Sequence, residues 1–185
     1  MRALLVVDMQ VGCFSGTPPR LDEAGTVSRI NALAQALRPQ GLVVFIQHTD
    51  ADEGYPRGMA PWQLLPTLHQ EAGDLTVEKT ACDAFLETEL HTLLQRRSVD
   101  ELYIVGCATD FCVDTTVRAA AALGYRVTVA SDAHTTRDRP HLPAGKIIEH
   151  HNYLWRDLLL PRKQKVRVVS TRQVLAELAS TPPPV

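Results

Sequence analysis

The stretch Leu102-Tyr103-Ile104-Val105-Gly106-Cys107-Ala108-Thr109-Asp110-Phe111-Cys112 contains the features that decide the fold of this chain. Its first four residues are a short apolar run typical of a buried strand. Residues 113–123 have the composition of a helix that ends before Gly124. Cys112 therefore falls at or near a predicted helix start. Unpaired amide N–H groups and the positive end of the helix dipole lower the pKa of a thiol there, so the sequence predicts a reactive cysteine.

The alternation of strand and helix continues along the chain. Further strands are expected at residues 3–7, 42–46, 126–130 and 166–169. Further helices are expected at residues 23–37, 86–94, 146–160 and 171–178. This alternation predicts an α/β fold: a doubly wound, mostly parallel sheet of five or six strands with helices on both faces.

Polar residues follow several of the predicted strands. Asp8 ends the first strand, Gln47 and His48 end the second, and Cys112 follows the strand at residues 102–105. In doubly wound sheets, ligands bind beyond the carboxyl ends of the strands. Residues 49–74 lack a clear periodicity and are expected to form a long loop over the same edge. We therefore expect the functional site at this edge of the sheet.

Size, charge and cysteine content restrict the classes of function. The chain has 185 residues, 45% hydrophobic content and a formal net charge of -2, which predicts one domain over residues 1–180 and a Pro-rich tail at 181–185. Apart from a basic cluster at residues 162–167, the basic residues are scattered, so neither nucleic acid nor a membrane is expected as a partner. The apolar run at residues 3–7 is too short for a signal peptide or a membrane span. Four cysteines without an export signal predict a cytoplasmic protein with free thiols.

Three residues are candidates for chemistry: Asp8, Lys79 and Cys112. A carboxylate directly after four apolar residues is costly to bury without a partner, so Asp8 needs an ion pair, a capping role or a catalytic role. Taken alone, Lys79 has the pattern of a solvated surface lysine. Taken together, the three residues indicate a catalytic site more strongly than any one of them does alone.

That set lies within motifs that resemble the isochorismatase-like cysteine hydrolases, a family that includes nicotinamidases and N-carbamoylsarcosine amidohydrolase. The resemblance covers roughly residues 3–179. Its motifs are Leu4-Leu5-Val6-Val7-Asp8-Met9-Gln10, Glu78-Lys79-Thr80, Gly106-Cys107-Ala108-Thr109-Asp110-Phe111-Cys112-Val113 and Ser131-Asp132-Ala133-His134.

The resemblance implies a triad of Asp8, Lys79 and Cys112. It implies cleavage of a C–N bond in a small amide, imide, ureido compound or lactam through a thioester on Cys112, with Asp8 as the base. It also implies a cis peptide bond between Cys107 and Ala108, and an oxyanion hole made by the backbone amides of Ala108 and Cys112.

The remainder of the expected site is less closely defined. Nicotinamidases hold a metal near this position with an Asp-x-His pair, whereas here the order in Gln47-His48-Thr49-Asp50 is reversed. His48, Asp50 and His69 are the residues that would hold zinc or another divalent metal, but we expect no cofactor. Phe14, Trp62 and Phe85, together with Tyr55, are candidate substrate-binding walls, with core packing as the alternative.

Two other functions stay open at this stage. One is isochorismatase-type hydrolysis of a small metabolite without covalent catalysis, although family members of that type lack the cysteine. The other is a redox-active thiol protein in which Cys112 pairs with Cys107 or Cys82. A small-molecule substrate is the expected partner. Because members of the family are often dimers or tetramers, a homo-dimer or homo-tetramer is expected. Apolar residues in 153–160 are suited to a subunit contact or to a buried crossover helix.

Overall fold

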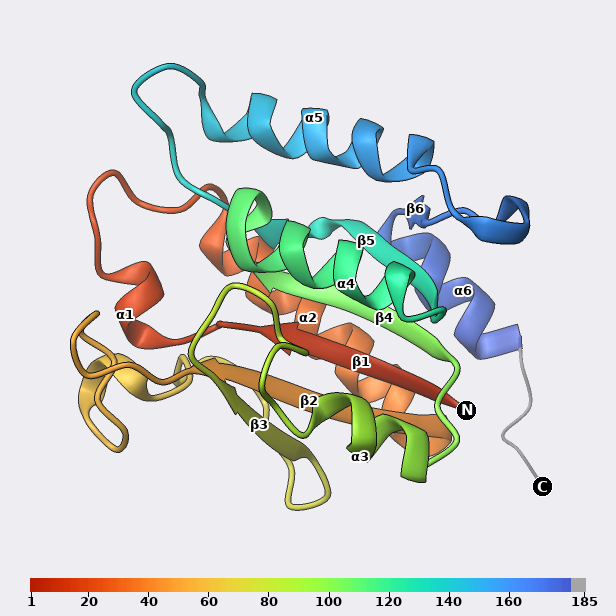
Figure 1. Cartoon of the computed structure of the whole chain (residues 1–185). Coiled ribbons are helices and arrows are strands. Elements are labelled where there is room, and N and C mark those ends of the chain that lie inside the picture. Colours follow the sequence, from red (N-terminus) through yellow and green to blue (C-terminus); the bar gives the residue numbers. More distant parts are fainter. Residues whose placement is uncertain (181–185) are drawn as a thin grey trace.

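The computed structural model describes residues 1–180, so the predicted Pro-rich tail at 181–185 lies outside the described residues. It contains a six-stranded sheet in which every pair of neighbouring strands is parallel, in the order β3-β2-β1-β4-β5-β6 (Figure 1). The strands are β1 (Arg2–Val7), β2 (Gly41–His48), β3 (Leu75–Lys79), β4 (Glu101–Cys107), β5 (Arg126–Thr135) and β6 (Arg167–Val169). The predicted parallel sheet is confirmed.

Helices cover both faces of this sheet (Figure 1). One face carries α3 (Leu90–Arg96), α4 (Asp114–Ala122) and α5 (Ala144–Asp157). The other carries α2 (Glu23–Leu37) and α6 (Thr171–Ser180). Short helical segments lie in the connections: α1 (Val11–Phe14), the 3-10 turns Arg38–Gln40, Ala60–Trp62 and Pro161–Lys163, and a π-helical turn, Thr109–Val113.

Strand β1 shows why central strands read as unbroken apolar runs. Leu5 and Val7 pack into the core on the side of α3, α4 and α5, whereas Leu4 and Val6 pack into the core on the side of α2 and α6. All four are buried. Because both faces of the sheet are covered, neither side of the strand tolerates polar residues.

Some elements differ from the sequence prediction at their ends. Helix α3 begins at Leu90 and not at residue 86, and α5 ends at Asp157 and not at residue 160. The helix expected from residue 113 is preceded by the π-helical turn. Strand β3 is not among the strands expected from the sequence, because it is an edge strand paired with β2 alone and its last two residues are charged.

The apolar residues of α5 divide between core and surface. The indole of Trp155 is fully buried and donates a hydrogen bond to Asp114 Oδ1 (2.7 Å), whereas Tyr153 and Leu159 are exposed. The expected homo-dimer or homo-tetramer remains a prediction. Among residues 1–180, every helix is too short or too polar to cross a bilayer.

The strand order places a reversal between β1 and β4. From β1 the chain winds outward to β2 and β3, then returns to form β4 on the other side of β1. The crevice at such a reversal, beyond the carboxyl ends of the strands, is the usual ligand site of a doubly wound sheet. Asp8 directly follows β1, and Ala108 directly follows β4.

Candidate active site

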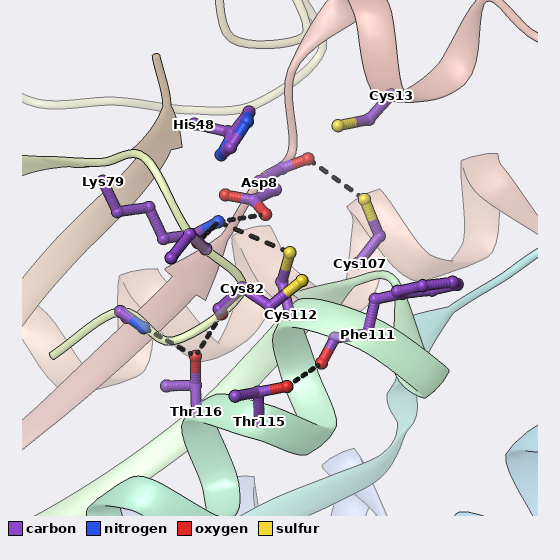
Figure 2. Close-up of polar contacts among 12 residues, drawn as sticks. Asp8, Cys13, His48, Lys79, Cys82, Cys107, Phe111, Cys112, Thr115 and Thr116 are labelled. Carbon is purple, nitrogen blue, oxygen red and sulfur yellow. Dashed lines mark hydrogen bonds and ion pairs between the residues drawn. The ribbon is translucent and has the colours of Figure 1, made fainter. Parts of the chain in front are cut away.

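The structure brings Asp8, Lys79 and Cys112 together at this reversal (Figure 2). Lys79, the last residue of β3, donates from Nζ to Asp8 Oδ2 (2.8 Å), to the Ala81 carbonyl (2.9 Å) and to Cys112 Sγ (3.4 Å). The side chains of Lys79 and Asp8 are 0% and 3% exposed. The lysine that resembled a surface residue when taken alone is therefore a buried cation bonded to both of the other groups.

Asp8 is held by the ends of two strands. Its N–H donates to the Ile46 carbonyl (2.9 Å), which extends the pairing of β1 with β2 by one residue. Its φ of 48° lies in the left-handed region, which aspartate tolerates better than most residues. The buried side chain of Gln10 then fixes the chain beyond it, accepting from the N–H of His48 (2.7 Å) and donating to the carbonyls of His48 and Trp62 (both 2.9 Å).

The end of β4 turns sharply against β1. Gly106 has a φ of 117°, and a Cβ at this position would lie 2.1 Å from the Val7 carbonyl oxygen. Glycine is required here by both the backbone conformation and the close approach. The peptide bond between Cys107 and Ala108 is cis, as the resemblance implied. The Ala108 carbonyl accepts from the N–H groups of Phe111 (3.0 Å) and Val113 (3.1 Å), which closes the π-helical turn that carries Cys112.

Side chains from the end of β5 and from α5 hold this turn in place through hydrogen bonds. His134 lies between Thr109 and Asn152, with its Nδ1 2.9 Å from Thr109 Oγ1 and its Nε2 3.1 Å from Asn152 Oδ1. Burial lowers the pKa of His134 to about 4, so the imidazole is neutral near pH 7 and can accept from the threonine while donating to the asparagine. His134 is therefore a positioning residue for the turn.

The electrostatics of Cys112 correct one expectation from the sequence. A helix start was expected to lower the pKa of this thiol, but burial and the Asp8 carboxylate raise it well above its ordinary value, although Lys79 opposes them. Burial also disfavours the charged form of Lys79, yet Asp8 and Cys112 outweigh it and raise the pKa of Lys79. The resting site is a protonated thiol beside a carboxylate–ammonium pair.

The four cysteines occupy different environments. Cys13 and Cys107 are buried, Cys82 is exposed and Cys112 is half-buried; all four are free thiols. Cys107 Sγ donates to the Asp8 carbonyl (3.0 Å), so this residue supports the turn of the chain at Asp8. Figure 2 shows Cys82 on the neighbouring segment, close to Cys112.

A cavity of about 420 Å³ opens onto the triad, and Asp8, Ala108 and Cys112 are among the residues that line it. Phe111 and Tyr55 contribute aromatic rings, and Tyr55 comes from the long loop that was expected over this edge. Arg20, Arg137 and Arg139 contribute three guanidinium groups. A volume of this size suits a small molecule.

Of the four aromatic residues predicted as substrate-binding walls, Tyr55 lines this cavity, whereas Phe14, Trp62 and Phe85 do not. Phe14 packs against the core and lies under the guanidinium of Arg20, 5.4 Å from the ring centroid. Trp62 Nε1 donates to Thr49 Oγ1 (2.8 Å), outside the cavity. Phe85 stacks on Tyr125, with ring centroids 5.9 Å apart. Core packing, which was the alternative for these residues, occupies the rings of Phe14 and Phe85, whereas the indole of Trp62 is held by its hydrogen bond.

Potential metal ligands gather beside the cavity, but in a different set from the one expected. His48, Asp50 and Glu53 offer ligand atoms that all lie within 4.8 Å of one another. His69 is not among them; its backbone N–H donates to Asn31 Oδ1 (2.9 Å). His48 Nε2 already lies 3.0 Å from Glu53 Oε2, and Asp50 Oδ1 accepts from the N–H of Asp52 (2.9 Å). The three groups can hold a divalent metal, and the expectation of no cofactor remains a prediction.

Comparison with known proteins places this arrangement in a family. The model of the isochorismatase domain matches residues 2–151. This chain belongs to the isochorismatase family. Among solved structures, a cysteine hydrolase from Pseudomonas syringae pv. phaseolicola is similar to it with a TM-score of 0.86 and 25% identity, over 97% of this chain and 92% of that one.

Two curated relatives show the range of family members that resemble this chain. Streptothricin hydrolase from Streptomyces noursei is 35% identical over 145 residues, which are 77% of this chain and 52% of that protein. The chain thus spans about half the length of that relative. Ureidoacrylate amidohydrolase RutB from Caulobacter vibrioides is 25% identical over 170 residues, covering 71% of this chain and 75% of RutB.

Sequence reasoning missed several residues of this isochorismatase-family site. Gln10 and His134 stand inside the motifs that carry the resemblance, and a buried polar residue there signals a positioning role. Arg20 and Arg137 had no such signal. They lie in two segments far apart in the sequence, and only the tertiary structure brings both to the cavity.

Proposed function

We propose that this isochorismatase-family hydrolase cleaves the C–N bond of a small amide, imide, ureido compound or lactam through a thioester on Cys112. One observation carries the proposal: Lys79 bonds both Asp8 and Cys112, and Asp8 and Cys112 open together onto one cavity. A thiol, a carboxylate base and a buried cation are the groups that nucleophilic acyl transfer requires. The similarity to an amidohydrolase and to a cysteine hydrolase supports the same reaction class.

The first step is transfer of the Cys112 proton to Asp8 as sulfur attacks the acyl carbon. Asp8 Oδ2 is engaged by Lys79, whereas Oδ1 is buried and has no hydrogen-bond partner among the described residues, which leaves it free to accept the proton. The transfer moves a negative charge from Asp8 to Cys112 without changing the net charge of the triad. Lys79, which touches both groups, stabilises the charge before and after the transfer.

The attack places a negative charge on the substrate oxygen. In this proposal the backbone amides of Ala108 and Cys112 donate to that oxygen, since both residues line the cavity. Losing one such donor typically lowers the rate by a factor of about 10²–10³. Gly106 and His134 support the turn that presents these amides.

The intermediate then collapses, and the amine leaves with the proton held by Asp8. A water molecule enters, gives its proton to Asp8 and attacks the thioester carbon. Collapse of the second intermediate breaks the C–S bond, and Cys112 regains the proton from Asp8. An amide gives a carboxylic acid and ammonia or an amine, a ureido compound gives a carbamic acid that loses carbon dioxide, and an imide or lactam gives the ring-opened acid. In each case one carboxyl group carries the protons.

The test is a panel of small amides and ureido compounds assayed by ammonia release, with imides and lactams assayed by chromatography. We expect the Cys112→Ala protein to lose at least about 10³-fold in kcat/KM on any compound that is turned over. Cys82→Ala is the matched control, because it removes a neighbouring thiol that takes no step in the mechanism. Its kcat/KM is expected to stay close to the wild-type value.

The same panel separates the other two functions. Hydrolysis that survives the Cys112→Ala substitution and fails in Asp8→Asn would indicate isochorismatase-type catalysis without a covalent intermediate. Absence of hydrolysis, with reversible loss of two thiols after peroxide treatment, would indicate a redox-active thiol protein. Either result would overturn the proposed amidase.

A further inference from the structure

Two arginines lie side by side in the wall of the cavity. Arg20 and Arg137 face each other in an isolated antiparallel bridge between the segment after α1 and the segment after β5. Directly opposed residues of such a pair extend their side chains on the same side. Both side chains donate to one acceptor, the Cys13 carbonyl, from Arg20 Nε (2.6 Å) and Arg137 Nη2 (2.8 Å). Both line the cavity that contains Asp8 and Cys112.

These two cations lack an acidic partner, unlike their neighbours. Arg139 is paired with Asp110 (2.8 Å) and Lys79 with Asp8 (2.8 Å). Among the described residues, no carboxylate lies within ion-pair distance of Arg20 or Arg137. Arg20 Nη1 is buried and has no hydrogen-bond partner in that part of the chain. A buried donor without an acceptor and two like charges on one carbonyl are both unfavourable unless an anion joins them.

The loop before Arg20 leaves space for this pair. A Cβ on Gly16 would lie 1.9 Å from Arg137 Nη1, so the Arg137 guanidinium occupies the space that a side chain at position 16 would fill. Gly16 itself lines the cavity. A larger residue there would displace the head of Arg137 without changing its charge.

We propose that Arg20 and Arg137 bind a carboxylate of the substrate, so that the compound hydrolysed is a small amide or ureido compound with a carboxylate at its other end. This inference rests on the proposed function. Guanidinium groups match the planar geometry of a carboxylate and hold it with paired, charge-assisted hydrogen bonds. The carboxylate fixes one end of the substrate, and the scissile carbonyl lies at Cys112 in the same cavity.

The decisive experiment measures binding, so that it does not depend on turnover. The Cys112→Ala protein is titrated by calorimetry with malonamic, succinamic and glutaramic acids and with their neutral methyl esters, in a buffer free of carboxylates. At least one acid is expected to bind about tenfold more tightly than its ester, the preference typical of hydrogen bonds to a charged group. Equal binding within every pair, preference for the esters or no binding of any acid would overturn the proposal.

Three variants in the Cys112→Ala background locate the effect. Arg137→Met and Gly16→Ala are expected to weaken binding of the preferred acid about tenfold and to leave binding of its ester within about twofold. Gly16→Ala retains both arginines, so it answers the objection that a lost cation merely destabilises the fold. Arg172→Met, which removes an exposed arginine on α6, is the matched control and should leave both affinities unchanged. Equal weakening of acid and ester would contradict an anion subsite.

Failure of this inference differs from failure of the proposed function. If neutral amides are hydrolysed in a Cys112-dependent way and the acids bind no better, the anion subsite is wrong and the amidase stands. If the acids bind through Arg137 but nothing is hydrolysed, the subsite stands and the amidase is wrong.

Discussion

Replacing Lys79 with methionine tests whether the triad is a buried, charge-balanced unit. The Lys79 side chain is 0% exposed, and its Nζ donates to Asp8, to the Ala81 carbonyl and to Cys112 at 2.8, 2.9 and 3.4 Å. Methionine keeps most of the apolar stem and removes the charge, which leaves the Asp8 carboxylate buried without a counter-ion. Breaking one side of a buried ion pair typically costs about 3–5 kcal/mol, and we expect a loss of that size in the free energy of unfolding.

A double-mutant cycle separates the charge effect from lost packing. Asp8→Asn removes the other charge, so adding it to Lys79→Met should restore about 2 kcal/mol, because the double variant has no unpaired ion. The measurement is urea unfolding at pH 7, followed by circular dichroism. Lys146→Met is the control, since that lysine is exposed and pairs with Glu149 on the surface of α5. A loss below about 1 kcal/mol for Lys79→Met, or strictly additive effects in the double variant, would refute the reasoning.

Three further predictions concern single groups. Alkylation of Cys112 by iodoacetamide, followed by mass spectrometry in a Cys82→Ala background, should accelerate through pH 9 without a plateau, because burial and Asp8 raise the pKa of Cys112; a plateau below pH 7 would contradict this. Burial lowers the pKa of His134 to about 4, so between about pH 6.5 and pH 4 the imidazole is protonated in the unfolded chain but not in the folded protein. The free energy of unfolding should therefore fall by about 3 kcal/mol as the pH falls through this range. His134→Gln should remove that part of the pH dependence, and an unchanged slope would exclude the assignment. Gly106→Ala should lower the free energy of unfolding by more than about 2 kcal/mol, since its Cβ would lie 2.1 Å from the Val7 carbonyl oxygen. Near-wild-type stability in urea would contradict this, because it would show that the backbone moves to accommodate the Cβ.

The fold could be predicted from the sequence because the central strands are buried on both faces. Strands β1, β2 and β4 each contain a continuous apolar run, and the intervening periodic segments identify the crossover helices. Strand β3 lacks that signal, since an edge strand ending in Glu78 and Lys79 has the composition of a loop. Local pattern therefore defined the middle of the sheet better than its β3 edge.

The candidate triad could be predicted because chain topology and motif agree. Asp8 and Cys112 follow strands that are neighbours at the reversal, and Lys79 ends the strand beyond β2. The direction of the Cys112 pKa could not be predicted, because it depends on burial and on the distance to Asp8. The spacing of residues in the sequence gives neither the burial of Cys112 nor its distance to Asp8.

Apart from Tyr55, the walls of the cavity could not be predicted, because they depend on how the loops fold. Phe14 and Trp62 lie in loop or near-loop segments close to the site, yet their side chains turn into other contacts. Arg20 and Arg137 reach the cavity only because two distant segments form a backbone bridge. Such a contact has no periodicity that the sequence could reveal.

The most direct test of the account is the mass of the protein during turnover. The amide from the panel that is hydrolysed fastest is mixed with wild-type protein, quenched in acid within the first turnovers and analysed as intact protein and as peptides. We expect an added mass equal to the acyl group, on the peptide that contains Cys112, and none in the Cys112→Ala protein. Steady turnover by the Cys112→Ala protein would contradict the assignment of Cys112 as the nucleophile. An acyl adduct on Cys82 in the wild-type protein would contradict it as well.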